Sequence, residues 1–173
     1  MITYIAILRG INVGGHRKLP MAALRELLND LGLSEVKTYI QSGNLIFKSK
    51  NTNIKSLEVA IEQAIKKQFN YEVPTLIREV SAWERAFSNN PYKDKDPKKV
   101  SFTFLSDTPE EKLESFISDY DEFIHIDDVV HVYCQNGYRK SKLHNNFFEK
   151  KLNVKATTRN WNTVNKLLTM AKE

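Results

Sequence analysis

The loop Arg9–Lys18 combines three cations, one histidine and three glycines within ten residues, a composition suited to binding an anion. It follows the apolar stretch Ile2–Leu8 and precedes a helical pattern, which is where phosphate-binding loops occur. Gly10 and Gly15 have the spacing of a P-loop, but the next two residues are His and Arg, where that motif needs Lys and Ser/Thr. The missing hydroxyl argues against nucleotide hydrolysis of that type. Two interpretations stay open, an anion-binding loop and a tight turn without a ligand.

The segment Ala156–Thr163 opens the last helical pattern of the chain. Thr158 or Asn160 can cap this helix through a side-chain oxygen. Arg159 is unusual there, because a cation beside a helix N-terminus opposes the macrodipole at a cost of about 0.3–1 kcal/mol. A bound anion would reverse that sign, since it would meet the guanidinium, the hydroxyls and the free helix N–H groups together.

The segment Gln41–Asn44 separates two strand patterns, Val36–Gln41 and Asn44–Ser49. We predict a hairpin with Ser42 and Gly43 as its two-residue turn, and the turn alone is enough to explain these residue types. Neither this segment nor the other two contains Asp or Glu. That composition argues against a metal hydrolase or a carboxylate acid–base pair built from them.

The remaining residues with reactive side chains form no recognisable site. His125 and His131 lie on a predicted hairpin and project to opposite faces, so they are poor joint metal ligands. Cys134 is the single cysteine, which excludes an internal disulfide, and we expect it to be buried and inert. We therefore expect no metal site, and the sequence leaves the question of a cofactor open.

Hydrophobic periodicity in the first half predicts the element order β-α-β-β-α-β, the ferredoxin-like pattern. The expected elements are a strand Ile2–Leu8, a helix from Pro20 to Leu31 ended by Gly32, the hairpin, a helix with the stripe Ile54, Leu57, Ile61, Ala64 and Ile65, and a strand Val73–Arg78. Pro74 confines this last strand to a sheet edge or places the proline at the strand's start.

The second half predicts β-α-β-β-α-β-α after a short helix around Trp83–Phe87 and a linker at Asn89–Lys99. The expected elements are a strand Val100–Phe104, a helix Leu113–Tyr120, a hairpin of Phe123–Ile126 and Val129–Cys134, a helix around Phe147–Leu152, a short strand Val154–Thr157 and a final helix from Trp161 to Leu168. The fold class is thus α+β, with two ferredoxin-like halves packed together and an extra C-terminal helix. We expect the halves to be residues 1–90 and 91–173.

Charge and composition describe an ordinary globular chain with a mild basic excess. The 173 residues include 26 Lys and Arg against 21 Asp and Glu, a net charge of +5, with 41% hydrophobic residues. The apolar run near the N-terminus is too short to span a bilayer and no basic segment precedes it, so we expect a cytoplasmic protein with no membrane partner. Residues 135–173 carry nine basic and two acidic side chains, which is either a solvated face or a basic docking surface.

Three long motifs resemble a known bacterial family, the domain-of-unknown-function family numbered 1697. They are Tyr4–Gly15 (YIAILRGINVGG), Thr38–Phe47 (TYIQSGNLIF) and Ala156–Val164 (ATTRNWNTV). The resemblance implies a compact bacterial α/β protein of two ferredoxin-like halves. It supplies no reaction, so whether the protein is an enzyme stays open.

The function that these residues favour is the binding of a small phosphorylated or carboxylated ligand at a polar pocket. The expected ligand-binding residues are Arg9, Asn12, Gly14, Gly15, Lys18, Gln41, Ser42, Asn44, Thr158, Arg159 and Asn160. One alternative is a nucleic-acid-binding module, for which a charge of +5 predicts only weak, sequence-independent affinity. Another is a structural or protein-interaction role, in which Arg9 and Arg159 belong to a buried polar network rather than to an open pocket. The sequence does not define the oligomeric state.

Overall fold

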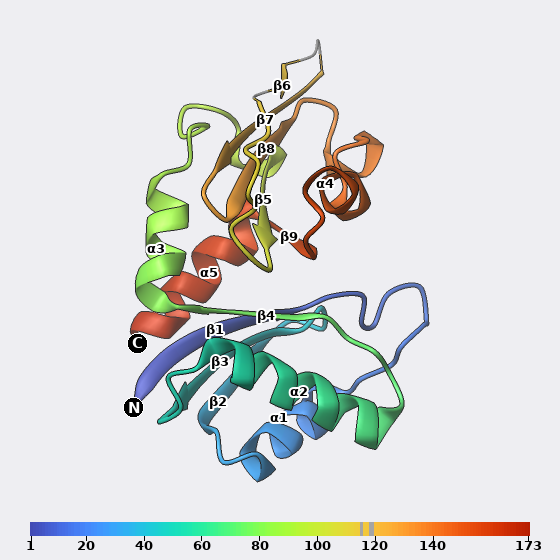
Figure 1. Ribbon diagram of the computed structural model, residues 1–173, viewed down its shortest axis with the longest axis vertical. Helices are drawn as coiled ribbons and strands as arrows, with labels where there is room; N and C mark the ends of the chain where they lie inside the picture. Colours follow the sequence, from blue (N-terminus) through green and yellow to red (C-terminus); the bar gives the residue numbers. More distant parts are fainter. Residues whose placement is uncertain (115, 118–119) are drawn as a thin grey trace. The chain divides into compact units, whose positions relative to one another are not determined.

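The computed structural model describes residues 1–114, 116–117 and 120–173, and its chain forms two compact units (Figure 1). The first unit consists of Met1–Glu84 with Leu167–Glu173, and the second of Arg85–Lys166. Each unit holds one antiparallel sheet together with helices, which confirms the α+β class. The predicted boundary between residues 90 and 91 stays a prediction.

The first unit has the predicted element order β-α-β-β-α-β. The elements are β1 Ile2–Leu8, α1 Met21–Asp30, β2 Ser34–Tyr39, β3 Asn44–Ser49, α2 Ile54–Phe69 and β4 Thr75–Glu79, followed by α3 Val80–Ser88. The strands lie in the order β2-β3-β1-β4, and every neighbouring pair is antiparallel. Helices α1 and α2 cover the same face of this sheet (Figure 1).

The core of the first unit lies between these two helices and the sheet. Tyr4, Ala6 and Leu8 alternate along β1 and pack with Leu24 of α1 and Ile61 of α2, all of them fully buried. The predicted stripe of α2 is thus confirmed as its core-facing side. Because β4 lies at the edge of the sheet, Pro74 just before it removes no ladder hydrogen bond, as expected.

Two local predictions in this unit need correction. Helix α1 starts at Met21 with Pro20 as its N-cap, and Leu31 is a 39% exposed C-cap residue rather than part of the buried stripe. The chain reverses at Gly32, whose φ of +80° ends the helix as predicted. The β2–β3 connection has four residues instead of two, because Tyr39 rather than Gln41 pairs with Asn44.

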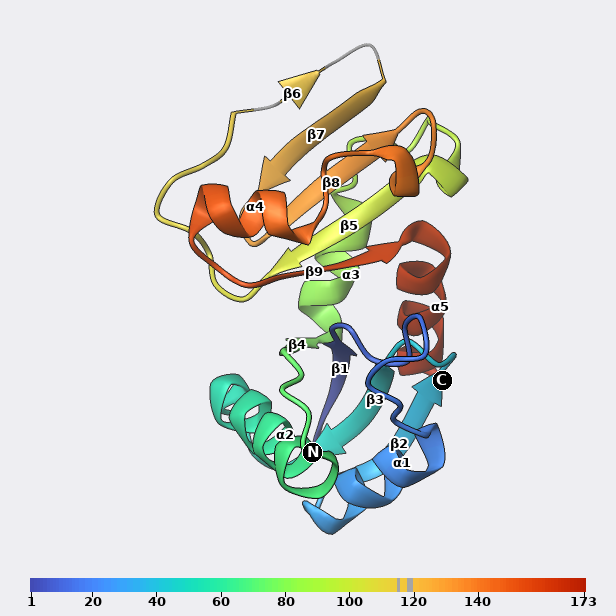
Figure 2. The same ribbon diagram turned by 90° about the vertical axis from the view of Figure 1, so that its right-hand side faces the viewer.

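The second unit holds a five-stranded antiparallel sheet in the order β6-β7-β8-β5-β9. Its elements are a 3₁₀ turn η1 Pro97–Lys99, β5 Val100–Leu105, β6 Phe116–Ile117, β7 Asp121–Ile126, β8 Val129–Cys134, a 3₁₀ turn η2 Tyr138–Lys140, α4 Asn145–Leu152 and β9 Ala156–Asn160. Helix α5, Trp161–Lys172, begins in this unit. Figure 2 shows α4 lying across one face of the sheet. Ile126 pairs with Val129, so the predicted two-residue turn at Asp127 and Asp128 is confirmed.

The helix predicted over Leu113–Tyr120 is wrong where the structure describes it. Residues 116 and 117 form strand β6, whose backbone pairs with Phe123 and Glu122 of β7, and Leu113 and Tyr120 are not helical. Residues 115, 118 and 119 of that prediction lie outside the described residues. The apolar spacing fits both a helix and an edge strand, and pairing with β7 decides between them. Among the described residues between β5 and β7 there is no helix of the kind that a ferredoxin-like unit has after its first strand, and the assignment of two ferredoxin-like halves is not confirmed.

Two further segments of the second unit differ from expectation. The segment predicted as a linker is packed at Asn90 and Tyr92, which are buried, and the Tyr92 ring lies 5.8 Å from that of Tyr133, whereas residues 93–98 are exposed. Strand β9 continues to Asn160, three residues beyond its predicted end. Arg159 is consequently a strand residue, paired with Phe102 of β5, although α5 begins only two residues later.

Candidate functional site

Asn12 joins the loop Arg9–Lys18 to the segment Gln41–Asn44 within the first unit. Its Nδ2 donates to the carbonyl of Leu19 at 2.9 Å and to that of Gln41 at 2.7 Å, while its Oδ1 accepts from the Leu19 amide at 2.8 Å. Its φ of +53° is a conformation that asparagine tolerates better than most residues. The side chain of Asn12 thus fastens the loop to the β2–β3 turn.

Gly14 and Gly15 form the tip of the loop. The His16 amide donates to the Val13 carbonyl at 3.0 Å, and both glycines have positive φ, +57° and +76°. The two glycines thus form a tight turn, and the binding of an anion by this loop stays a prediction. The tip is exposed, as is Lys18 beyond it.

The β2–β3 turn packs tightly against β1. Asn44 is fully buried, and its Nδ2 donates to the Tyr39 carbonyl at 3.0 Å and to Ser42 Oγ at 2.9 Å. The carbonyl of Gly43 accepts from the Leu8 amide at 2.8 Å. These contacts explain the motif as a structural turn. Gln41 itself is exposed and contributes its backbone carbonyl to Asn12.

Arg9 follows β1 at the start of the loop. Its amide donates to the Pro74 carbonyl at 3.0 Å, which fixes the backbone at the end of the sheet. The residue is half-buried, neither the open surface cation of a ligand site nor a fully enclosed one. The sequence predicted either an exposed Arg9 in an open ligand pocket or a buried Arg9 in a polar network, and the half-buried side chain fits neither.

The predicted ligand-binding residues of the second unit, Thr158, Arg159 and Asn160, follow one another at the end of β9, so neighbouring side chains point to opposite faces of the sheet. Thr158 Oγ1 lies 2.8 Å from Thr103 Oγ1 and 2.7 Å from Asn145 Oδ1 of α4. Asn160 Oδ1 accepts from the Thr163 amide at 2.9 Å, which confirms Asn160 as a cap of α5. Arg159 lies between them in a strand, so its side chain projects to the face opposite Thr158.

Arg159 is half-buried, and its Nη1 donates to the Thr158 carbonyl at 2.9 Å. Burial lowers the pKa of its guanidinium to about 10. The group still carries its charge at neutral pH, because that value lies well above 7.

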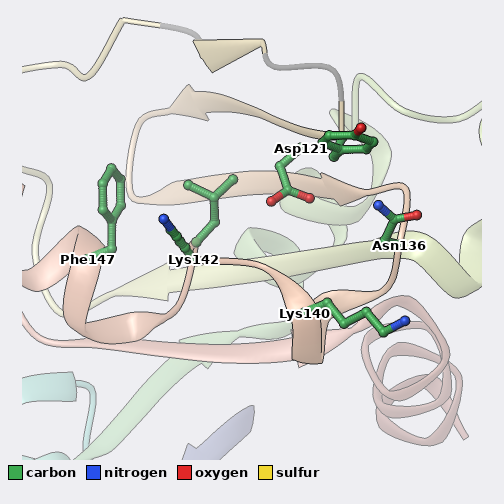
Figure 3. A pocket seen from close by; sticks show the side chains of 7 residues that line it. Asp121, Asn136, Lys140, Lys142 and Phe147 are labelled. Atoms are coloured by element: carbon green, nitrogen blue, oxygen red, sulfur yellow. The ribbon is translucent and has the colours of Figure 1, made fainter.

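A pocket in the second unit contains none of the predicted residues. It has a volume of about 480 Å³ and lies between the start of β7, the β8–α4 connection and the first turn of α4 (Figure 3). Its lining residues are Tyr120, Asp121, Asn136, Lys140, Lys142, Leu143 and Phe147. The sequence held one signal for it, the basic excess of residues 135–173, which supplies both lysines.

The backbone reverses sharply to form this pocket. Asp121 pairs with Cys134 at the end of the β7–β8 hairpin, and the Gln135 amide then donates to the Tyr120 carbonyl at 2.8 Å. Gly137 adopts a φ of +89° and donates its amide to the Cys134 carbonyl at 2.9 Å. These bonds turn the chain into η2, which brings Lys140 to the pocket.

Ser141 does not line the pocket but contacts two residues that do, Asp121 and Leu143. It is buried, and its Oγ donates to Asp121 Oδ2 at 2.9 Å and accepts from the Leu143 amide at 3.0 Å. Because Ser141 is fixed in this way, the exposed residues Lys140 and Lys142 on either side of it are fixed at the backbone. In Figure 3 Lys142 extends toward Phe147, whereas Lys140 extends to the opposite side.

An aromatic side chain closes the other end of the pocket. Phe147 is half-buried, and its ring meets Phe148 at 5.2 Å and Phe123 at 6.5 Å between centroids, both in edge contacts. Phe147 also borders a neighbouring hollow that Lys150 lines. Its ring is therefore held by the core and still presents surface on the pocket side.

Cys134, His125 and His131 of this unit are all buried. Burial raises the pKa of the Cys134 thiol to about 11, so it stays protonated, as expected of a buried, inert cysteine. His125 Nδ1 accepts from the Leu113 amide at 3.1 Å, so its proton is on Nε2, 2.7 Å from the Asp127 carbonyl. His131 pairs with Ile124, one residue before His125, which confirms that the two histidines face opposite sides.

Neither a metal cluster nor a membrane span is found in residues 1–114, 116–117 and 120–173. No group of three or more His, Cys, Asp or Glu side chains in these ranges is placed to hold a metal ion. None of the helices there combines the length and the apolar character needed to cross a bilayer.

Comparison with known proteins identifies the family and leaves the activity open. The chain belongs to the family described as "Protein of unknown function (DUF1697)", which matches residues 1–136. A solved structure described as conserved bacterial protein SP0830 from Streptococcus pneumoniae is similar, with a TM-score of 0.77, 24% sequence identity and 98% of each chain covered. At that identity the likeness supports the fold alone. No curated protein sequence matches the chain significantly.

Proposed function

We propose that this protein binds a small anionic ligand and that the pocket beside Ser141 holds it. The observation that carries the proposal is the charge around the pocket. Two exposed lysines, Lys140 and Lys142, stand against one carboxylate, and that carboxylate, Asp121, already accepts a hydrogen bond from Ser141. The volume of about 480 Å³ lies within the range of about 300–1,000 Å³ usual for small-molecule sites.

The residues predicted from the sequence would bind the anion at the loop, the hairpin turn and the start of α5. Most of their side chains make hydrogen bonds within the protein, and this favours the pocket beside Ser141 as the binding site. Asn12 and Asn44 use their side chains to hold the loop and the turn. Thr158 is engaged by Thr103 and Asn145, on the face opposite Arg159. Arg159 stays the competing charge partner for an anion. The cytoplasmic location expected from the sequence also stays a prediction.

Calorimetric titration with inorganic phosphate and with citrate at low salt tests the proposal. We expect the double variant Lys140→Ala/Lys142→Ala to lose about tenfold or more in affinity, because it removes the charge-assisted hydrogen bond from whichever of the two lysines holds the anion. The matched control is Lys151→Ala/Lys155→Ala, which removes two exposed lysines that do not line the pocket and should leave the affinity nearly unchanged.

Two results would contradict the proposal. If wild-type protein binds neither phosphate nor citrate, the anion-binding function is wrong. If Arg159→Ala abolishes binding while Lys140→Ala/Lys142→Ala binds normally, the anion lies at the sequence-predicted position and the pocket assignment is wrong.

A further inference from the structure

We infer that the anionic ligand of this pocket is an amphipathic monocarboxylate, a molecule with one carboxylate group on an apolar body. The inference rests on the proposed function and adds the chemical class of the ligand. It comes from the lining of the pocket, which is predominantly apolar and has the side chain of Lys142 extending toward Phe147 (Figure 3). A saturated fatty acid of medium chain length is the simplest molecule with these two parts.

The apolar wall of the pocket belongs to the edge of the hydrophobic core of the second unit. Leu143 is a buried member of that core, and Phe147 packs half-buried against it, with its ring in edge contact with Phe148. Tyr120 adds a ring that is 61% exposed. An exposed aromatic ring beside a concave apolar surface is typical of a site that a ligand covers. Each CH2 group that moves from water onto such a wall raises the affinity by up to about fourfold.

Lys142 supplies a positive charge at this wall. Its side chain extends toward Phe147 (Figure 3), and its ammonium has no hydrogen bond or ion pair with any residue of the described ranges. Lysine lays its alkyl stem along apolar surface and keeps its charged end in water. A ligand carboxylate can therefore replace the water around this ammonium without breaking a contact among the described residues, while the apolar body of the ligand covers the ring of Phe147.

Asp121 restricts the ligand to one negative charge. In Figure 3 the Lys142 ammonium lies between Phe147 and the Asp121 carboxylate. The hydroxyl of Ser141 holds that carboxylate in place with a hydrogen bond of 2.9 Å. Because like charges repel, Asp121 disfavours a second or third negative charge on the ligand. Lys140 does not compensate, since it extends away from the other side chains of the pocket, so we expect monocarboxylates to bind more tightly than phosphate or citrate.

The test is a calorimetric series at low salt with acetate, butanoate, hexanoate and octanoate, with phosphate and citrate as multivalent anions. We expect the affinity to rise by about two- to fourfold with each added CH2 group, so that octanoate binds at least about tenfold more tightly than phosphate or citrate. Octanamide has the same apolar body without the charge. It should bind about fivefold or more weakly than octanoate, because it lacks the charge-assisted hydrogen bond.

Lys142→Met tests the charge. The variant keeps an unbranched apolar side chain and removes the ammonium, so octanoate should fall to within about twofold of octanamide while the affinity for octanamide changes little. The matched control is Lys151→Met, at an exposed lysine that does not line the pocket, and it should keep the wild-type preference. If Lys140→Met removes the preference instead, the anion lies at the other lysine and the inference is wrong.

Tyr120→Ser tests the apolar wall. The variant removes an exposed ring, so it should lower the ratio of octanoate to butanoate affinity by about threefold or more and keep the preference for octanoate over octanamide. The control Val59→Ser removes an exposed apolar side chain of α2 in the first unit and should leave both ratios unchanged.

The outcomes separate this inference from the proposed function. If phosphate, citrate and octanoate bind with similar affinity, or if acetate binds as tightly as octanoate, the monocarboxylate inference is wrong and anion binding stands. If no probe binds, both are wrong. Octanamide binding as tightly as octanoate to the wild-type protein also overturns the inference, as does a preference for octanoate that both Lys142→Met and Tyr120→Ser leave unchanged.

Discussion

Thr158 and Arg159 are adjacent in sequence, but their side chains lie on opposite faces of the second sheet. Thr158 pairs with Thr103 of β5 and its hydroxyl lies within hydrogen-bond distance of Thr103 and of Asn145 of α4. Arg159 pairs with Phe102, whose ring stacks on Phe87 of α3 at 6.1 Å between centroids. The strand geometry therefore prevents these two residues from converging on one anion, which the local sequence had indicated.

The threonines of β9 allow a matched comparison of two buried hydroxyls. Thr158→Val should lower the free energy of unfolding by about 1–3 kcal/mol, because Thr103 and Asn145 lose a hydrogen-bond partner. Thr157 is 1% exposed, and its Oγ1 has no partner among the described residues. Thr157→Val removes that unsatisfied hydroxyl and should be neutral or stabilising by up to about 1 kcal/mol. Urea denaturation of both variants measures the difference. Equal losses for the two would contradict the assigned contacts.

Gly43 should be far less replaceable than Gly32, although the two share the same backbone conformation. Their φ values are +81° and +80°, so either Ala variant costs about 1–2 kcal/mol for the left-handed conformation. A Cβ on Gly43 would lie 2.6 Å from Leu8 Cβ and 2.9 Å from Ile11 Cδ1, whereas at Gly32 it meets nothing within 4 Å. We expect Gly43→Ala to lose a further 1–3 kcal/mol or so from overpacking. Thermal and urea denaturation of both variants test this, and equal stability would contradict it.

Asn12 should be a stability residue rather than a ligand residue. Asn12→Gly keeps the positive φ and removes the three side-chain hydrogen bonds to Leu19 and Gln41, so it should cost about 2–3 kcal/mol. The control is Asn70→Gly at the left-handed C-cap of α2, where glycine is favoured and the change should stay within about 0.5 kcal/mol. Chemical denaturation reports both values. A loss of anion affinity in Asn12→Gly with unchanged stability would contradict the structural role.

Periodicity predicted most strands and helices because their signals are local. The stripe Ile61–Ile65 and the hairpin at Asp127 follow from spacing alone and match the structure. The helix predicted over Leu113–Tyr120 does not match the structure. Residues 116 and 117 pair with β7, and the spacing of apolar residues along the chain does not predict which strands pair.

The pocket could not be predicted for the same reason. Its polar wall depends on Ser141 reaching Asp121, twenty residues earlier in the chain, through one side-chain hydrogen bond. The lysines that flank Ser141 look like ordinary surface residues in the sequence. By contrast, the conspicuous motifs around Asn12 and Asn44 proved to be turn chemistry, in which side-chain amides satisfy backbone groups of the loop and the hairpin.

Acid should destabilise the protein through His131. Burial lowers the pKa of this histidine from 6.5 to about 4 in the folded protein, and the side chain is 1% exposed. Between about pH 6.5 and pH 4 the unfolded chain thus binds a proton that the folded chain excludes, so stability falls as pH falls through this window. A difference of this size corresponds to at most about 3 kcal/mol. Urea denaturation at pH 7 and pH 4.5 measures the loss in wild type and in His131→Leu.

We expect wild type to lose about 2–3 kcal/mol more than His131→Leu over that interval, because the variant has no imidazole to protonate. The other titratable groups are present in both proteins and cancel in the difference. The control His16→Asn removes an exposed imidazole of the loop tip and should follow the wild-type curve. Parallel curves for wild type and His131→Leu would show that His131 takes up its proton in the folded protein as readily as in the unfolded chain, and the predicted acid sensitivity would then be wrong.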